Sequence, residues 1–398
     1  MFVSFPFKFI LYPGKTLFMK SFPVILRRQS LIQTSKTATM SYKVKTTCLH
    51  FSSFLILLLF CRPAFSQSKK PAPEPSPYNM EAVDHLLKQN EKVLGNNFVA
   101  LVWKDGKIVY QKQGGPDFSP KAQAPIAGAG SWLTAALVMT FVDEGKLSLD
   151  DKVTQYIPLF GKYMKGYITI RNCLTHTTGI KSEGEDGTRV MRNKSGSLED
   201  EVNSYASKKD IGTNPGTEFF YSNLGPNIAA RVLEVISKKS FDRLMMERII
   251  HPLKLKGTSF TNEEGGAVNA AGGARSTAND YISFLSMLLN KGMFGDKRIL
   301  SEKAVEEMET AQFPALPVKS MPKTLQGVHF GLGNYILGDG DAKTTTFFCP
   351  SLLGTTAIID KCRNYAAILI VQKPEEEQKK ALSLSMKNLI DEAIPCGN

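Results

Sequence analysis

Hydrophobic and polar positions divide the chain into strands near both ends and helices between them. Met80–Leu94 places apolar residues at helical spacing. Phe98–Trp103 and Ile108–Lys112 are predicted strands on either side of a short polar turn. Ser131–Glu144 is a strongly apolar predicted helix that ends at Gly145.

The middle of the chain, from about 150 to 325, is predicted to be mainly helical, with Asn227–Ser237 and Thr277–Asn290 as examples. The loop Ser182–Ser197 is rich in glycine, serine and charge. The pattern then returns to strands and closes with a helix; the predicted segments are Phe330–Leu337, Thr355–Ile359, Tyr365–Val371 and a helix over about Pro374–Ile394.

Strands at both ends with helices between them predict an α+β fold. Both chain ends would contribute to one antiparallel sheet flanked by helices, and residues of about 150–325 would form a mainly helical lobe. The expected organisation is a leader over 1–66, a proline-rich linker over 67–77 and one folded domain over 78–398.

The leader has the composition of a secretory signal peptide. Lys43 and Lys45 precede the short apolar run Phe51–Phe60, and Ala64–Ser66 resembles a small-residue cleavage site. This pattern predicts a start at Met40, cleavage after Ser66 and a secreted or periplasmic protein. An organelle presequence and a retained signal anchor are the alternatives. The apolar run is too short for a stable membrane span.

Charge adds little about function once the leader is set aside. The net charge is +12, but residues 1–66 hold nine basic and no acidic side chains, which leaves 40 basic against 37 acidic groups in the remainder. A nucleic-acid partner is therefore not expected.

Six cysteines are present, of which Cys48 and Cys61 lie in the leader. The other four allow three pairings, and the sequence does not choose among them; one disulfide or buried thiols is the simplest expectation. Their spacing is not that of a zinc site, and neither a metal nor another cofactor is expected. These four are Cys173, Cys349, Cys362 and Cys396.

Four phrases occur in a fixed order: Ser131–Ala136 leading into Val142–Asp151, Ile168–Arg171 leading into Leu174–Gly179, Pro215–Thr217 followed by Tyr221-Ser222-Asn223, and Gly272–Thr277. Together they resemble the class C β-lactamase and penicillin-binding-protein-like serine hydrolases, over about residues 95–372. The resemblance implies a β-lactamase/transpeptidase-like fold. It also implies three active-site elements: Ser-x-x-Lys on the central helix, Tyr-x-Asn, and His-x-Gly or Lys-x-Gly on a strand.

The first element is missing. Counting back from Gly145 by the spacing of the family places Gly128 at the nucleophile and Ser131 at its lysine partner. A register shifted by three residues would offer Ser131 as nucleophile, but Thr134 would then stand where a lysine is needed. A serine hydroxyl needs an adjacent base before it can act as a nucleophile.

The second element persists as Tyr221 and Asn223, and the third is degraded. Cys349 and Pro350 stand in the segment before Gly354, where the family has a histidine or lysine. His176 lies in a phrase that is structural in the family. The candidate site is therefore a vestigial one made of Ser131, Tyr221 and Asn223, with Gly128 at the nucleophile position.

Three functions remain open at this stage. The first is a catalytically inactive or strongly impaired member that keeps a groove for a partner or for a small peptide, ester or cell-wall-like ligand. The second is an active hydrolase of the esterase, β-lactamase or D-amino-acid peptidase type that uses Ser131 with Tyr221 as base. The third is a structural envelope protein. The sequence does not determine the oligomeric state.

Overall fold

The computed structural model describes residues 77–181, 195–260, 266–313, 316–320, 328–338, 345–350, 354–372 and 378–397. Met1–Pro71 and Ala72–Asn398 are separate compact units, and only the second contains described residues. The predicted leader and most of the loop Ser182–Ser197 lie outside the described residues.

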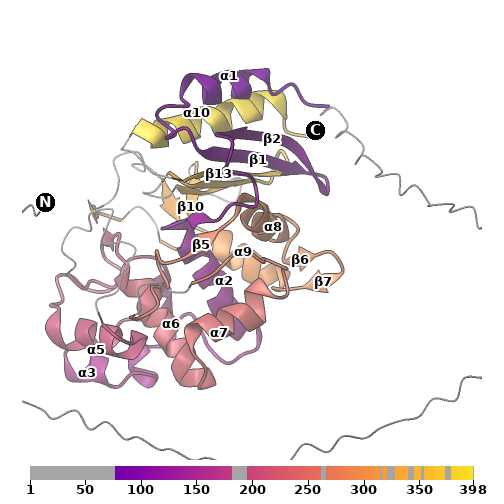
Figure 1. The fold of residues 1–398 in the computed structure, drawn as a ribbon. Helices are drawn as coiled ribbons and strands as arrows, with labels where there is room; N and C mark the ends of the chain where they lie inside the picture. Colours follow the sequence, from indigo (N-terminus) through magenta and orange to yellow (C-terminus); the bar gives the residue numbers. More distant parts are fainter. Residues whose placement is uncertain are drawn as a thin grey trace, which may run out of the picture. The chain divides into compact units, whose positions relative to one another are not determined.

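The described residues contain a seven-stranded antiparallel sheet with the order β2-β1-β13-β12-β11-β10-β9 (Figure 1). The first strand pairs directly with the last, from Phe98 opposite Val371 to Lys104 opposite Tyr365. The prediction of one sheet built from both chain ends is confirmed. The strands are β1 (Phe98–Lys104), β2 (Lys107–Gly114), β9 (His329–Phe330), β10 (Tyr335–Leu337), β11 (Thr346–Pro350), β12 (Thr356–Asp360) and β13 (Tyr365–Val371).

Helices cover both faces of this sheet. Every residue of β12 and β13 is buried, because each face of these strands is packed against apolar side chains. Helices α1 (Glu81–Gln89) and α10 (Gln378–Ala393) lie together over one face, and α8 (Ala278–Leu289) packs against the other (Figure 1). Both ends of the domain are therefore held on the same side of the sheet.

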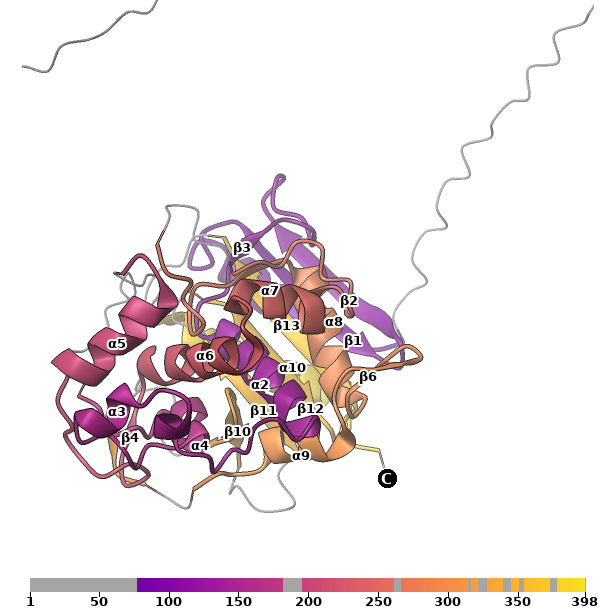
Figure 2. The same cartoon turned by 90° about the horizontal axis from the view of Figure 1, so that it is seen from below.

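Helix α2 (Ala129–Asp143) runs through the interior between the sheet and the helical lobe (Figure 2). Its residues from Ala129 to Phe141 are all buried, which is typical of a helix that is apolar on every side. Gly145 follows the helix with a φ of +66°, a left-handed conformation that glycine adopts without strain. The predicted central helix is confirmed, and it begins two residues earlier than its apolar pattern indicated.

The helical lobe holds the remaining helices and three short strand pairs (Figure 2). Thr169 and Asn172 form a capping box at the start of α4, and Ser197, Thr277 and Ser301 cap later helices. The helices are η1 (Val153–Gln155), α3 (Leu159–Lys162), α4 (Ile170–Leu174), α5 (Leu198–Lys208), α6 (Leu224–Ser237), α7 (Phe241–Met245), the π-helix η3 (Met246–Ile250) and α9 (Glu302–Glu309). The pairs are β3 (Ala124–Pro125) with β5 (Arg275–Ser276), β4 (Phe219–Phe220) with β8 (Val318–Ser320), and β6 (Met293–Phe294) with β7 (Lys297–Arg298).

Two predicted elements differ from the structure. The first helix ends at Gln89, not at Leu94, and continues as turns. The predicted strand Phe330–Leu337 is two strands, β9 and β10, separated by a turn at 331–334. Gly333 has a φ of +73°, and a Cβ there would lie 2.7 Å from the backbone oxygen of Ser131, so the turn packs closely on α2.

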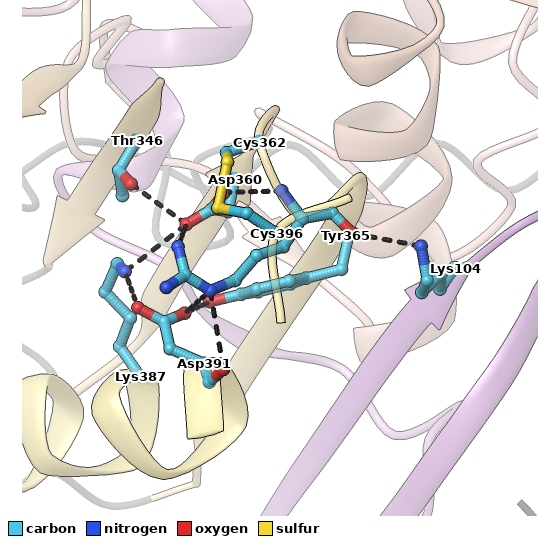
Figure 3. Close-up of a disulfide and its surroundings, with 9 residues drawn as sticks. Lys104, Thr346, Asp360, Cys362, Tyr365, Lys387, Asp391 and Cys396 are labelled. Carbon is cyan, nitrogen blue, oxygen red and sulfur yellow. Dashed lines mark hydrogen bonds and ion pairs between the residues drawn. A yellow bond between two sulfur atoms is a disulfide. The ribbon is translucent and has the colours of Figure 1, made fainter. Parts of the chain in front are cut away.

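The four cysteines in the described part of the chain form one disulfide and two free thiols. Cys362 and Cys396 are bonded, which ties the β12–β13 turn to the residues after α10 (Figure 3). Cys173 and Cys349 are buried free thiols. This agrees with the expectation of one disulfide or buried thiols, although the spacing left the pairing open.

A group of partnered charges surrounds the disulfide (Figure 3). The fully buried carboxylate of Asp360 accepts hydrogen bonds from the Thr346 hydroxyl at 3.1 Å and from the Arg363 backbone at 3.0 Å and side chain at 3.2 Å. The Lys387 ammonium lies 3.4 Å from Asp360 and also pairs with Asp391, which accepts from the Tyr365 hydroxyl at 2.8 Å. We call Thr346, Asp360, Arg363, Tyr365, Lys387 and Asp391 the Asp360 cluster.

Candidate functional site

A small cavity lies where the N-terminus of α2 meets the sheet and the helical lobe. Its volume is about 10 Å³, room for roughly one water molecule. It brings Gly128, Ser131 and Tyr221 together, three of the four residues singled out in the sequence. The other lining residues are Leu174, Thr175, His176, Phe330, Gly331, Gly333, Asn334, Tyr335, Cys349 and Pro350.

Gly128 directly precedes α2 and faces the phenol of Tyr221. An ideal Cβ built on Gly128 would lie 2.7 Å from the Tyr221 hydroxyl oxygen, closer than real Cβ atoms come to a neighbour. The Tyr221 hydroxyl therefore occupies the space that any side chain at this position would need. Sequence pattern could not indicate this contact, because the two residues are far apart in the chain.

Ser131 is buried and its hydroxyl is engaged. It donates to the backbone oxygen of Ala271 at 3.1 Å. One turn further along, the Thr134 hydroxyl donates to the backbone oxygen of Ala270 at 2.6 Å. Ser131 and Thr134 are the residues that the register shifted by three would place at the nucleophile and lysine positions. Both hydroxyls instead bond α2 to the segment before β5, which is a structural role.

His176 packs beside Tyr221, with ring centroids 4.6 Å apart. Its Nδ1–H donates to the backbone oxygen of Ser222 at 3.0 Å, and burial lowers its pKa to about 4. The ring is therefore neutral near pH 7. Its backbone has a φ of +56°, and histidine is one of the residues that tolerate this conformation. The structure supports the structural role expected for His176.

Aromatic rings fill the space around the cavity. Phe219 and Phe330 stack with centroids 3.8 Å apart, and Phe330 also meets Tyr335 edge-on at 5.2 Å. His176 meets Phe219 at 5.7 Å. Edge-to-face contacts such as those of Phe330 with Tyr335 and of His176 with Phe219 are favourable beyond their buried area. The sequence does not mark Phe219, Phe330 or Tyr335 as site residues, because isolated aromatic residues in an apolar pattern indicate only a buried core.

Strand β11 borders the cavity with Cys349 and Pro350. Burial raises the pKa of the Cys349 thiol to about 12, so this thiol stays protonated and is a poor nucleophile. Proline has no N–H to donate and ends the strand opposite Thr356. The described part of β11 therefore presents neither a charged group nor a backbone donor at Pro350.

Asn223, the fourth predicted site residue, is not among the residues that line the cavity. It is buried and occupies the N-cap position of α6. The structure thus groups Ser131 and Tyr221 with Gly128 and leaves Asn223 outside.

Comparison with known proteins identifies the family. The beta-lactamase family model matches residues 87–385, about three quarters of the sequence. The chain belongs to the β-lactamase family. The family and the α+β, β-lactamase/transpeptidase-like fold expected from the sequence motifs are confirmed.

Relatives of this β-lactamase-family chain include enzymes and proteins of other lengths. The crystal structure of a "putative beta-lactamase" from Bacteroides dorei DSM 17855 has a TM-score of 0.71 and 27% identity, covering 80% of this chain and 99% of that one. A "Putative D-alanyl-D-alanine carboxypeptidase" of Escherichia coli K12 is 21% identical over 83% of this chain and 91% of its own. "Protein flp" of Staphylococcus aureus MW2 is 28% identical over 40% of this chain, and the match spans only 34% of that protein.

A second, wider cavity lies in the helical lobe of this β-lactamase-family protein. Its volume is about 620 Å³, within the range of small-molecule sites. Ile180 and Phe220 contribute apolar surface. The polar lining includes the four lysines Lys181, Lys208, Lys209 and Lys319, together with Asp210 and Glu218. We call it the lysine-rimmed cavity.

Among the described residues, no group of three or more histidine, cysteine, aspartate or glutamate side chains is arranged to hold a metal ion. None of the described helices is long and apolar enough to cross a membrane.

Proposed function

We propose that this protein is an exported, non-catalytic member of the β-lactamase family that binds a ligand or partner. The observation that carries the proposal is the position of the Tyr221 hydroxyl, 2.7 Å from where a Cβ at residue 128 would stand. A nucleophilic side chain is absent from that position, and a different residue fills its place.

Three features around the cavity support loss of catalysis together. Gly128 has no hydroxyl, Ser131 uses its own to bind Ala271, and Cys349 and Pro350 stand where the family has a polar strand residue. Loss of the nucleophile alone can lower kcat by roughly a million-fold in serine hydrolases. The cavity of about 10 Å³ also leaves no room for a peptide or ester while the aromatic rings keep these positions.

The lysine-rimmed cavity supports the binding part of the proposal. Its volume suits a small ligand, and its four lysines against two carboxylates favour a ligand that carries an anionic group. A small peptide or cell-wall-like fragment with a free carboxylate has this chemistry.

Export is supported by the signal-like leader and by the Cys362–Cys396 disulfide. Disulfides form and persist mainly in oxidising compartments such as the periplasm and the cell exterior. N-terminal sequencing of the mature protein tests this part, and Gln67 is the expected first residue. A mature start upstream of residue 60 would exclude cleavage after Ser66.

The catalytic part is tested by intact-mass measurement after incubation with a fluorophosphonate or a penicillin. We expect no covalent adduct on the unmodified protein. An adduct that disappears in the Ser131→Ala variant would instead support the active hydrolase that uses Ser131. A Ser383→Ala variant, which removes another buried hydroxyl on α10, is the matched control for nonspecific labelling.

The structural envelope alternative differs in its binding behaviour. Calorimetric titration with short peptides that carry a free carboxylate should give saturable binding that weakens in a Lys208→Gln, Lys209→Gln variant. Absence of adduct together with absence of any such binding would favour the structural role.

A further inference from the structure

Three large apolar side chains are exposed within five residues of the helical lobe. The exposed fractions are 38% for Tyr163, 88% for Met164 and 76% for Tyr167. The other exposed large hydrophobic residues in the described part of the chain, Ile108, Met246 and Val318, lie apart from one another in the sequence. We call residues 163–167 the apolar tip. Clustered exposed apolar residues are a mark of an interaction surface, whereas single ones are ordinary.

The backbone of the apolar tip is strained at its most exposed residue. Met164 has a φ of +61°, in the left-handed region. This conformation costs a residue with a Cβ roughly 1–2 kcal/mol, and glycine or asparagine adopts it more readily. The large apolar side chain of Met164 is therefore exposed to water, at a backbone conformation that a smaller or polar residue would adopt more easily.

Hydrogen bonds of the buried Lys165 hold the apolar tip against the rest of the helical lobe. Lys165, in its middle, is only 4% exposed, and its ammonium donates to the backbone oxygen of Ala206 at 2.7 Å and of Tyr163 at 3.4 Å. Its backbone N–H donates to the backbone oxygen of Phe160 at 2.8 Å. A buried lysine is costly unless its charge is hydrogen-bonded, and here those bonds fix the turn that points Met164 outward.

Two lysines lie beside the apolar tip, and Asp210 lies near its buried Lys165. Lys162 precedes the tip and is exposed, and the Lys152 ammonium lies 5.5 Å from the centre of the Tyr167 ring. No aspartate or glutamate occurs between Leu159 and Ile170. Helix α3, which leads into the tip, lies at the edge of the helical lobe away from the sheet (Figures 1 and 2). The tip can thus meet a surface without obstruction from the sheet.

We infer that the apolar tip docks this protein on an anionic membrane surface. Tyrosine is suited to the membrane interface because its ring is apolar and its hydroxyl stays hydrated. Lysine adds attraction to anionic headgroups. The three side chains expose roughly 400 Å² in total, since a large side chain offers about 150–250 Å² when fully exposed. That is half of the roughly 800 Å² that each partner of a stable protein complex buries, so shallow insertion into lipid fits the tip better than a protein partner.

The test uses the chain from Ala72, the start of the second compact unit, so that the apolar run of the leader does not contribute. Co-sedimentation is measured with vesicles of equal parts phosphatidylglycerol and phosphatidylcholine, and with vesicles of phosphatidylcholine alone. We expect binding to the anionic vesicles and weaker binding to the neutral ones. Met164→Ser should lower the partition coefficient by roughly 10- to 100-fold, because transfer of a methionine side chain from water into an apolar environment is strongly favourable. Lys162→Gln should lower it about fivefold on anionic vesicles only.

Ile108→Ser is the matched control, because Ile108 is 39% exposed but lies on strand β2, outside the tip. It should bind as the unmodified protein does. Urea unfolding of each variant separates lost binding from lost folding. The inference is overturned if the unmodified protein binds neither vesicle or if Met164→Ser binds like Ile108→Ser. It is also overturned if Met164→Ser changes only self-association. None of these outcomes bears on covalent labelling, so they leave the proposed function untouched.

Discussion

The cavity beside Gly128 and the Asp360 cluster both adjoin the seven-stranded sheet, and both hold buried polar groups. Beside the first, Gly128 and Ser131 stand at the positions that the motif spacing predicts for the nucleophile and its lysine partner, the Ser131 hydroxyl bonds to a backbone oxygen, and aromatic rings fill the surrounding space. In the second, four charged side chains are kept, and every one has a partner of opposite charge (Figure 3).

The difference follows from what each polar group costs when buried. A buried charge destabilises the fold unless ion pairs and hydrogen bonds replace its lost hydration. In the Asp360 cluster those partners come from β11, β12, β13 and α10, so the charges hold the C-terminal helix on the sheet. The residues that line the cavity beside Gly128 include no ion pair of this kind, and aromatic side chains fill the space around it instead.

The largest expected effect is at Asp360. Asp360→Ala removes a fully buried carboxylate and leaves Arg363 and Lys387 short of a partner, so the free energy of unfolding should fall by about 3–5 kcal/mol. Urea unfolding measures it. Asp150→Ala is the matched control: its ion pair with Arg171 is at the surface, and the loss should stay below about 1 kcal/mol. Equal losses at both positions would contradict this account of the cluster.

The disulfide beside the cluster should have the next largest effect. Replacing Cys362 and Cys396 by serine frees the residues after α10 from the β12–β13 turn. For a loop of 34 residues the expected loss is about 3–4 kcal/mol, mainly because the unfolded chain gains freedom. Thermal unfolding with and without reductant checks it. Reductant should destabilise the unmodified protein and leave the double variant unchanged.

On the other side of the comparison, His176 should make stability depend on pH. Its pKa is near 6.5 when unfolded and about 4 in the fold, lowered by burial. Between these values the unfolded chain binds more protons, so stability is complete above pH 6.5 and falls as pH drops toward 4, by about 2–3 kcal/mol.

His176→Asn keeps a residue that tolerates the left-handed backbone and removes the titrating ring. Urea midpoints measured across this pH range should therefore change less in the variant. His251→Asn, at an exposed histidine, should follow the unmodified protein. If His176→Asn also follows it, the buried ring does not govern the acid sensitivity.

The smallest expected effect concerns Gly128. Gly128→Ser forces the Tyr221 hydroxyl to move, and we expect a loss of about 1–2 kcal/mol. Tyr221→Phe removes that hydroxyl, and the ring carbon that carried it lies 3.9 Å from the same Cβ position, an ordinary contact. In a double-mutant cycle measured by urea unfolding, the serine should cost less when it is combined with Tyr221→Phe than when it is introduced alone.

The same contact bears on restoring the family motif. Gly128→Ser with Ser131→Lys would rebuild Ser-x-x-Lys, but the lysine must enter a position that is 4% exposed beside a cavity of about 10 Å³. We expect fluorophosphonate labelling to remain absent. Clear labelling of this double variant would mean that the aromatic rings around the cavity move aside to admit the lysine and the probe, contrary to what their packing indicates.

Much of the fold could be predicted because it depends on local pattern. The continuous apolar runs of β1 and β13 indicated buried strands at both chain ends, and the apolar residues of α2 indicated a core helix. The motif order identified the family. The assignment of Gly128 to the nucleophile position rests on the spacing to Gly145 alone and stays a prediction.

The site itself depends on contacts between distant segments, which pattern does not show. The resemblance placed Tyr221 and Gly128 in one site, but nothing in the sequence indicates that the Tyr221 hydroxyl fills the side-chain space at Gly128, or that Phe219 stacks on Phe330. The break at 331–334 was missed because a glycine turn within an apolar run resembles a continuous strand. The sequence pattern likewise does not predict that Met164 is exposed, because a large apolar residue is expected to be buried in the core.

The pairing of β1 with β13 has a consequence for how the chain matures. Phe98 cannot meet Val371 until nearly the whole polypeptide has been synthesised, so the centre of the sheet must form late. Folds dominated by such distant pairings form slowly. A chain that leaves the ribosome with its sheet incomplete stays extended longer, which is the state that translocation through a narrow export channel requires. Late formation of the β1–β13 pairing is therefore compatible with the export proposed above.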